Sequence, residues 1–128
     1  MKILRLNGTN KKLYALVAPL VMNPAVIRQN NNYPYKTSSK YMWHLMVEKD
    51  EVIGFIPLKP TLNGYCIDNY YYKLDTPEIF EKLLDDVLEA GYEELSATAH
   101  KCDVKAFTKR GFTLLTELSK YSKLIKAK

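Results

Sequence analysis

The sequence predicts an α/β protein built on one mixed, twisted central sheet that is flanked by helices. Three observations support this class. Short runs such as "KILRLN" have the period of two that strands show. Other segments carry helical spacing, and the clearest of them is "TPEIFEKLLDDVLEAG". The two kinds follow one another in the order β-α-α-β-β-β-α-β-α-β, and 128 residues suit a single domain over residues 1–128.

The first third of the chain begins as a strand and continues as helices. "KILRLN" alternates apolar and charged residues, and "NGTN" supplies turn chemistry after it. Helical spacing follows in "KKLYALVAPLVMN", with Thr9 or Asn10 as the N-cap. Because Pro19 and Pro24 argue against one long helix, we expect a kink or break near Pro19 and a short second helix, "AVIRQ". The polar segment "NNNYPYKTSSK" is typical of a surface loop.

The middle of the chain predicts an antiparallel meander and then a long helix. The apolar runs "YMWHLMVEKD" and "EVIGFIPLKP" meet at "KDE", as in a tight hairpin, and "GYCIDNYYYKL" is the expected third strand. The long helix is predicted over Thr76 to Ala90. Asp75 or Thr76 is its expected N-cap, Glu78 can close a capping box on Asp75, and Gly91 ends it.

The last third predicts a strand, a short helix and further strand material. The strand is "YEELSATAHK", the helix is "DVKAFTKR", and "FTLLTELSKYSKLIK" forms one strand or a hairpin. The segment "KRGF", Lys109 to Phe112, stands at the end of the short helix. We expect Gly111 to adopt a left-handed backbone that stops the helix, and Phe112 to fill the gap between this helix and the sheet.

Composition and charge restrict the classes of function. A hydrophobic content of 47% with 26% charged residues excludes global disorder. The net charge of +5 is unevenly spread: residues 1–46 hold seven bases and no acid, residues 47–97 four bases and twelve acids, and residues 98–128 eight bases and two acids. A nucleic-acid-binding protein would need both basic blocks on one face. Blocks that are separate in sequence usually disperse on folding, so nucleic acid is not a favoured partner.

Cysteine usage and hydropathy favour the cytoplasm. Cys66 and Cys102 have no CxxC partner and lie in apolar, strand-like contexts, so we expect reduced, buried thiols and no metal site. The apolar run in "MKILRLNGTN" is too short for a signal peptide, and no apolar window approaches the length of a membrane span. We therefore predict a cytoplasmic protein that has no membrane partner.

The chain resembles the GNAT superfamily of acyl-CoA-dependent N-acyltransferases in the order of its elements, and most clearly in "AHKCDVKAFTKRGF". That family's second half runs strand, long helix, strand and a short helix that ends in a Lys-x-Gly-Phe-like turn. The segment "MVEKDEVIGFIPLK" is similar to the family's central hairpin. The resemblance covers nearly the whole chain, and it implies the GNAT fold with an acyl-CoA such as acetyl-CoA as cofactor. The chain also resembles the short, divergent members found in phage and prophage genomes.

The resemblance places the acyl-CoA site before the long helix, where this sequence departs from the family pattern. Family members hold the pyrophosphate on an Arg/Gln-x-x-Gly-x-Gly/Ala loop, whose bare amides and helix dipole attract phosphate. The matching segment, "YYYKLDTPEIF", contains no glycine, and Asp75 and Glu78 add negative charge. We therefore expect acetyl-CoA to bind weakly, with a dissociation constant of about 100 μM or above, or not at all. The cofactor-binding residues that the resemblance implies are Asn69, Tyr70, Tyr71, Tyr72, Lys73 and Thr76.

The catalytic groups of the family are also altered. The tyrosine that protonates the departing thiolate in many members is replaced by Phe107, and the Asn that commonly begins the short helix is replaced by His100. His100 is either a substitute acid or base or a solvated residue at a strand end. Asp68, on the third meander strand, is the candidate general base, and its alternative role is that of an outward or turn-bonded aspartate. His44, inside "MWHLMV", is expected to be a structural or edge residue.

Two hypotheses about function follow. The first is an N-acetyltransferase, with a small-molecule or protein amine as acceptor, in which Asp68 or His100 moves protons. The second is a non-catalytic protein that keeps the GNAT fold as a scaffold for binding protein or nucleic acid. Glycines between Lys73 and Pro77 would have favoured the enzyme, and their absence leaves both hypotheses open.

Overall fold

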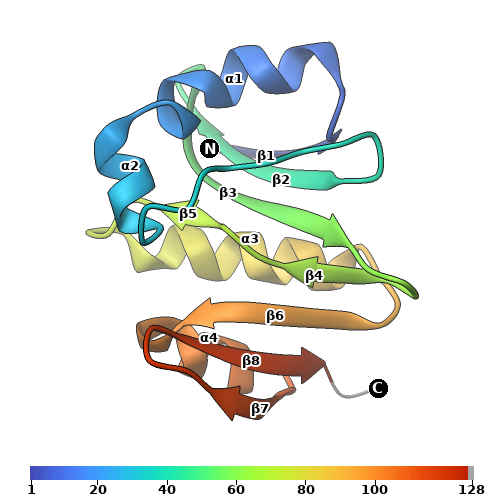
Figure 1. Cartoon of the computed structure of the whole chain (residues 1–128). Helices are drawn as coiled ribbons and strands as arrows, with labels where there is room; N and C mark the ends of the chain where they lie inside the picture. Colours follow the sequence, from blue (N-terminus) through green and yellow to red (C-terminus); the bar gives the residue numbers. More distant parts are fainter. Residues whose placement is uncertain (127–128) are drawn as a thin grey trace.

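The computed structural model describes residues 1–126, which form one sheet with helices on both faces (Figure 1). The strands run β1-β2-β3-β4-β6-β8-β7 across the sheet, and β5 pairs with β3 beside β4. The pair β4–β6 is parallel and the other neighbours are antiparallel, so the sheet is mixed, as predicted. The strands are β1 (Lys2–Asn7), β2 (Met42–Glu48), β3 (Glu51–Pro60), β4 (Tyr65–Ile67), β5 (Tyr71–Tyr72), β6 (Leu95–His100), β7 (Phe112–Glu117) and β8 (Tyr121–Lys126).

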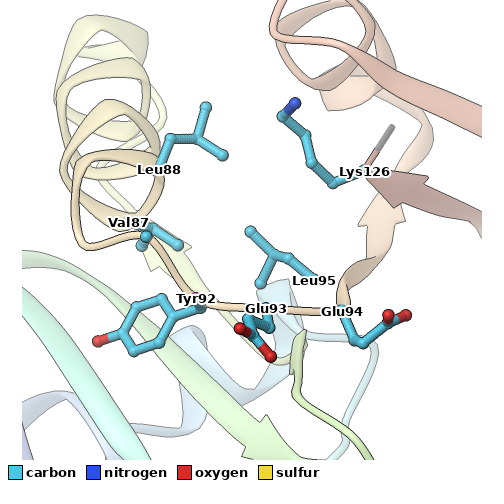
Figure 2. A pocket seen from close by; sticks show the side chains of 8 residues that line it. Val87, Leu88, Tyr92, Glu93, Glu94, Leu95 and Lys126 are labelled. Carbon is cyan, nitrogen blue, oxygen red and sulfur yellow. The ribbon is translucent and has the colours of Figure 1, made fainter. Parts of the chain in front are cut away.

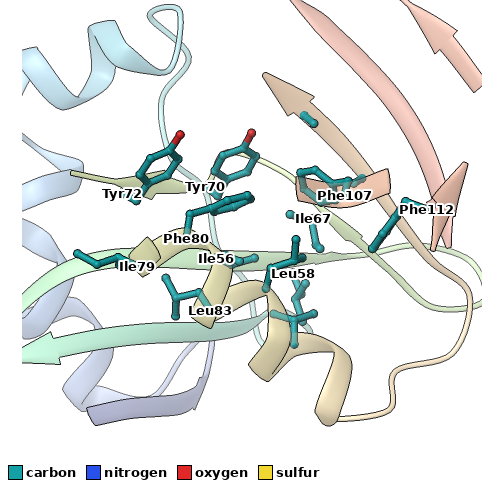
Figure 3. Packing of buried hydrophobic residues seen from close by; sticks show 14 of the residues in the cluster. Ile56, Leu58, Ile67, Tyr70, Tyr72, Ile79, Phe80, Leu83, Phe107 and Phe112 are labelled. Carbon is teal, nitrogen blue, oxygen red and sulfur yellow. The ribbon is translucent and has the colours of Figure 1, made fainter. Parts of the chain in front are cut away.

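Two apolar clusters pack against opposite faces of the central strands. One joins β2 and β3 to α1 through residues such as Leu13, Val17 and Phe55. The other joins the sheet to α3 and α4, with Phe80 and Phe107 at its centre (Figure 3). Burial on both faces explains why β2 and β3 are continuous apolar runs rather than alternating ones. The helices are α1 (Lys11–Val21), α2 (Pro24–Gln29), α3 (Pro77–Glu89) and α4 (Val104–Thr108), with a 3-10 turn, η1 (Lys101–Asp103), before α4.

The N-terminal helices follow the predicted cap and differ at one proline. Asn10 caps α1, because its side-chain oxygen accepts a hydrogen bond of 2.8 Å from the amide of Lys12. The expected break at Pro19 does not end the helix, since Pro19 lies inside α1, which continues to Val21. The helix then stops before Asn23, which caps α2 in the same way.

The cap predicted for the long helix is wrong in its chemistry. Thr76 is the N-cap residue of α3, yet neither its side chain nor that of Asp75 caps the helix amides. The Thr76 hydroxyl instead donates to the carbonyl of Lys73, at 3.1 Å. The capping box between Asp75 and Glu78 is likewise absent from the bonds of residues 1–126. The first amides of α3 are therefore free of side-chain caps.

The third meander strand is divided. "GYCIDNYYYKL" was expected to form one strand, but β4 ends at Ile67 and β5 begins at Tyr71. Between them Asn69 has a φ of 54°, in the left-handed region that non-glycine residues seldom adopt. This break moves the chain from the neighbourhood of β6 to a pairing with β3 alone, and it shapes the candidate site.

The structure confirms the roles predicted for Gly111 and Phe112, whereas the burial predicted for both cysteines is wrong. Gly111 has a φ of 89° after the short helix, and Phe112 is buried, in edge contact with Phe107. The strand material after it is the hairpin β7–β8. Both cysteines are free, but Cys102 is exposed and Cys66 half-buried, because η1 leaves the sheet before Cys102. Within residues 1–126 no helix is long and apolar enough to cross a bilayer.

Candidate functional site

The site begins where the two parallel strands of the sheet separate. β4 and β6 pair from Tyr65 with Leu95 to Ile67 with Ala97. Beyond this point β5 pairs with β3, while the rest of β6 pairs with β8. The two strands therefore diverge after Ile67 and Ala97, between Tyr70 and the end of β6. Two pockets border this gap, one at Asp68 and one at Tyr70.

The first pocket, here called the Asp68 pocket, has a volume of about 460 Å³. Loop 30–41, the ends of β3 and β4, and the strands β6 and β8 all contribute to it. Its lining combines three tyrosines with two lysines and one carboxylate. The lining residues are Tyr33, Pro34, Lys36, Tyr41, Lys59, Asp68, Asn69, Thr98 and Tyr121.

Asp68 has the properties of a proton acceptor in this pocket. Burial raises the pKa of its carboxyl above the ordinary value, against the lowering effects of the Asn69 amide and the nearby Lys59. A half-buried carboxylate with a raised pKa binds a proton more readily than a solvated one. Asp68, the candidate base predicted from the sequence, thus lies in a pocket at the strand divergence. A carboxyl of raised pKa in a pocket is typical of a functional site.

A side-chain network fixes the backbone next to Asp68. The Asn30 amide, which is 2% exposed, donates 2.9 Å to Oδ1 of Asn69 and 3.2 Å to the carbonyl of Tyr33. Asn31 donates 2.8 Å to the hydroxyl of Tyr121. These bonds tie the end of α2 and its loop to the left-handed turn at Asn69, so the loop and the strand break are held together.

The second pocket, here called the Tyr70 pocket, contains a cluster that the sequence did not predict. Asp103 is 6% exposed and accepts hydrogen bonds from two tyrosine hydroxyls, 2.5 Å from Tyr70 and 2.6 Å from Tyr72. The Tyr70 hydroxyl also accepts a 2.9 Å bond from the amide of His100, and so it bridges the gap between the diverging strands. Figure 3 shows both tyrosine rings beside Phe80. The pocket measures about 120 Å³, and its lining is Gln29, Tyr70, Tyr71, Tyr72, Leu74, His100, Cys102 and Asp103.

Burial and the neighbouring Asp103 keep Tyr70 and Tyr72 protonated. Burial, followed by the adjoining carboxylate, raises the pKa of Tyr70 and Tyr72 well above the ordinary value. His100 lies at the same place, with its ring against Tyr70 and Tyr121. Burial lowers the pKa of His100, so its imidazole is neutral at pH 7. The buried Phe107, in register with the family's tyrosine, belongs to the core.

Basic residues of α4 stand opposite the start of α3. A third pocket, the Lys105 pocket of about 210 Å³, opens between the two helices. Lys105 and Lys109 line it together with Glu81 and Asp103, so its charges are mixed. Lys73 is exposed in the loop before α3. Of the predicted cofactor-binding residues, Tyr70, Tyr71 and Tyr72 lie at the Tyr70 pocket, whereas Asn69 lines the Asp68 pocket.

A second polar cluster lies under α3, away from the strand divergence. Nδ1 of His44 is 2.7 Å from Oδ2 of Asp86, and Nε2 is 2.8 Å from the hydroxyl of Tyr92. Arg5 binds the same carboxylate through two nitrogens, at 2.9 and 3.0 Å. Burial lowers the pKa of His44, which is 0% exposed, although Asp86 opposes the effect. His44 is structural, as predicted.

A larger hollow than the Asp68 pocket lies away from the divergence. It measures about 690 Å³ and lies between the end of α3 and the last strand, with Leu88, Tyr92 and Lys126 around it (Figure 2). None of the predicted site residues lines it. Volume alone would select this hollow, but a carboxylate of raised pKa and a break in strand pairing select the Asp68 pocket. Within residues 1–126 no cluster of three or more His, Cys, Asp or Glu side chains is arranged to hold a metal.

Comparison with known proteins gives a fold and no close relative. No protein-family model matches the sequence, and no curated protein matches it. Among solved structures, Escherichia coli ElaA superposes with a TM-score of 0.77 at 16% identity, over 99% of this chain and 100% of that one. An acyl-CoA N-acyltransferase from Pseudomonas aeruginosa superposes with the same score at 15% identity, with the same coverage.

A third neighbour carries a ligand. The Campylobacter jejuni N-acetyltransferase PseH, in complex with acetyl coenzyme A, superposes with a TM-score of 0.61 at 15% identity, over 97% of both chains. At these identities the likeness establishes architecture, since one fold hosts many functions. The chain therefore has the fold of the GNAT acyltransferases, as its sequence predicted.

Proposed function

We propose that the protein is an acyl-CoA-dependent N-acyltransferase whose amine acceptor binds in the Asp68 pocket. The observation that carries the proposal is the pair of pockets on either side of the point where β4 and β6 part, with a carboxylate of raised pKa in one of them. An acyl transfer needs two substrates that meet at one point, and a base beside the attacking amine. The strand divergence supplies such a point.

The residues of the donor side fit an acyl-CoA in part. The uncapped amides at the start of α3 and the ammonium groups of Lys105 and Lys109 suit a pyrophosphate. Asp103 and Glu81 oppose it, and the loop before α3 has no glycine. When bound, the thioester supplies an acyl carbon that an amine can attack. This mixed set of charges supports the weak binding that the sequence predicts.

The chain's own groups would then handle the protons. The Asp68 carboxylate takes a proton from the ammonium form of the acceptor, so that a neutral amine is the nucleophile. The leaving thiolate needs a proton, and Phe107 cannot supply one. The hydroxyls of Tyr70 and Tyr72 and the ring of His100 are the nearest candidates at the Tyr70 pocket. The tyrosines stay protonated at neutral pH, but their hydroxyls donate to Asp103, so either one would have to leave that carboxylate to protonate the thiolate.

A scaffold without catalysis is the second candidate, and one observation favours it. The Tyr70 pocket holds about 120 Å³, whereas small-molecule sites usually measure roughly 300–1,000 Å³. The Tyr70 hydroxyl also occupies the His100 amide, a group on the edge of the gap. Under this hypothesis the Asp103 cluster closes the donor side, and acetyl-CoA does not bind.

Calorimetric titration with acetyl-CoA separates the two candidates. We expect the parent to bind with a dissociation constant of about 100 μM or above, and the variant Asp75→Asn with Glu78→Gln to bind more tightly, because charge repulsion is removed while the amides stay open. Glu48→Gln with Asp50→Asn, at the exposed β2–β3 turn, is the matched control for lost charge. No detectable heat from any form would support the scaffold. Sub-micromolar binding by the parent would contradict the expected weakness and strengthen the enzyme hypothesis.

Acyl transfer itself is measured as thiol release from acetyl-CoA in the presence of a mixture of primary amines. The Asp68→Asn variant should lose about 100-fold in turnover at pH 7 and recover part of it at higher pH, where the amine deprotonates unaided. Equal turnover by parent and variant would exclude Asp68 as the base.

A further inference from the structure

We propose that the acceptor is an anionic amine: a primary amine on a molecule that also bears a carboxylate or a phosphate, held by Lys36 and Lys59. The inference rests on the proposed function, because it names the substrate class of the Asp68 pocket. The two sources of such a ligand are an amino acid and a phosphorylated aminosugar, which share the same pair of charges.

The charges around the pocket carry the argument. The lining contains two lysines and one carboxylate. Lys123, on β8, also acts on the Asp68 carboxyl. Lysines therefore outnumber acids around the pocket. In the proposed function its one carboxylate, Asp68, pairs with the reacting amine, so the lysines are left for an anionic group. A polyamine or a lysine-rich peptide would bring several cations to this surplus of positive charge, which disfavours it.

The arrangement of the charges suits a ligand that has an amine at one end and an anionic group at the other. Lys59 and Lys123 are among the charges that lower the pKa of Asp68, and Lys36 is not. Lys36 belongs to the loop after α2, whereas Lys59 lies near the end of β3, so the two cations reach the pocket from different elements. An amine at Asp68 would place the anion of the same molecule within reach of a lysine.

The walls add a preference for a flat or ring-shaped body. Tyr33, Tyr41 and Tyr121 line the pocket, and the rings of Tyr33 and Tyr121 lie 6.4 Å apart. The Tyr121 ring is also held from behind by His100, at 5.2 Å, and by the Asn31 bond to its hydroxyl. Aromatic walls of this kind bind rings through their faces, and a tyrosine that is already held, as Tyr121 is, loses little entropy when it does so.

Direct binding tests the inference without any acyl donor. Titrations followed by NMR would compare tyrosine with tyramine, which lacks the carboxylate, and with 3-(4-hydroxyphenyl)propionate, which lacks the amine. A second arm compares glucosamine 6-phosphate with glucosamine. In at least one arm we expect loss of the anionic group to weaken binding about tenfold, and added salt to reduce the difference. The arm with the tighter ligand identifies the source.

Variants locate the effect. Lys36→Ala with Lys59→Ala should weaken the anionic amine about tenfold and leave tyramine or glucosamine unchanged. Lys12→Ala with Lys82→Ala, two lysines outside the pocket lining, is the matched control and should change neither ligand. Thermal unfolding of each variant checks that the fold is kept. Binding of tyramine, glucosamine or spermidine as tight as that of the anionic amines would overturn the inference, and so would no binding in either arm.

Failure of the inference and failure of the proposed function give different results. If the anionic amine binds through the two lysines and no thiol is released from acetyl-CoA, the site survives and the acyltransferase proposal fails. If thiol is released with tyramine in preference to tyrosine, or with glucosamine in preference to glucosamine 6-phosphate, the acyltransferase stands and the substrate class is wrong.

Discussion

The two polar clusters, around Asp86 and around Asp103, contain similar side chains but differ in how the carboxylate is paired. Each contains a carboxylate and a tyrosine hydroxyl, which are bonded directly at Asp103 and are linked through the His44 ring at Asp86. Arg5 neutralises Asp86 through two hydrogen bonds and lowers its pKa. Asp103 has no ion-pair partner among residues 1–126, and its acceptors are filled by two neutral hydroxyls. A carboxylate paired with a cation, as Asp86 is, is typical of a stabilising cluster. A carboxylate without a cationic partner that borders two pockets, as Asp103 does, is typical of a functional site.

The largest expected effect is on the Asp103 cluster. Asp103→Ala should lower the free energy of unfolding by about 3 kcal/mol, because two buried hydroxyls lose their acceptor. Urea denaturation measures this loss. Asp75→Ala, an exposed carboxylate nearby, is the control and should stay within about 0.5 kcal/mol of the parent. A loss for Asp103→Ala as small as the control's would show that the two bonds contribute nothing net.

The Asp86 cluster should respond less to the same change. Asp86→Ala is expected to cost about 2 kcal/mol, since His44 is left with an unpaired ring nitrogen while Arg5 can turn to water. The Arg5 side chain is 40% exposed, so solvent screens its share. In an Arg5→Met background the cost of Asp86→Ala should fall by about 1 kcal/mol. Full additivity of the two changes would mean that Arg5 does not compensate the carboxylate.

The third prediction is that acidification weakens the Asp86 cluster first. His44 has a lowered pKa in the folded state, so the unfolded chain binds more protons below its ordinary value of 6.5. Stability is therefore full above that value and falls as the pH drops below it, by about 1 kcal/mol at pH 5. His100 shifts in the same direction and adds to the slope. The depressed pKa of Asp86 removes further stability only below 3.8.

Thermal unfolding between pH 8 and pH 5 measures this slope. His44→Gln should flatten it more than His100→Gln, because His44 is fully buried while His100 lies at a pocket. An unchanged slope in His44→Gln would show that another group titrates in this range.

The smallest expected effect is that of a single hydroxyl. Tyr72→Phe should cost about 1 kcal/mol, because its hydroxyl is one of two donors to Asp103 and the ring remains packed on Phe80. The same variant removes a candidate proton donor, so turnover should fall further than stability suggests. A drop in turnover without a change in the acetyl-CoA dissociation constant would assign the hydroxyl to proton transfer, and a change in both would assign it to pocket shape.

The fold was predictable because its signals are local. The α1 cap at Asn10, the β2–β3 turn, the α3 stripe and the left-handed Gly111 each depend on residues within a few positions of one another. The position of Asp68 followed from the resemblance to a known family, and the structure places it in a pocket at the strand divergence. Its role as a base remains a prediction.

Most of the features that the sequence did not predict depend on contacts between distant residues. "CIDNYYY" contains no glycine or proline that would mark the end of β4, and the turn at Asn69 is held by Asn30, 39 residues earlier. Asp103 looks like an acid in the first turn of a helix, but its partners lie 31 and 33 residues away. The missing cap of α3 is a local exception: Asp75 and Thr76 both have suitable chemistry, but neither side chain caps the helix, and the Thr76 hydroxyl donates to the carbonyl of Lys73 instead.

The short parallel pairing of β4 with β6 also determines how the molecule can open. Three residue positions of hydrogen bonding join the β1–β5 part of the sheet to the β6–β8–β7 part. Elsewhere the two parts are joined by side chains: by the apolar core, such as Phe80 against Phe107, and by the hydrogen bonds that Tyr70 and Tyr72 make with Asp103. The bonds from the His100 amide to Tyr70 and from Asn31 to Tyr121 also cross between them. Residues 95–126 should therefore exchange their amide hydrogens as one cooperative unit, at a lower free energy than β2 and β3. The Asp68 pocket is lined from both parts: Tyr41 and Lys59 belong to the β1–β5 part, and Thr98 and Tyr121 to the β6–β8–β7 part. A ligand bound in the Asp68 pocket would therefore contact both parts of the sheet. It should slow amide hydrogen exchange throughout residues 95–126, including residues that it does not contact.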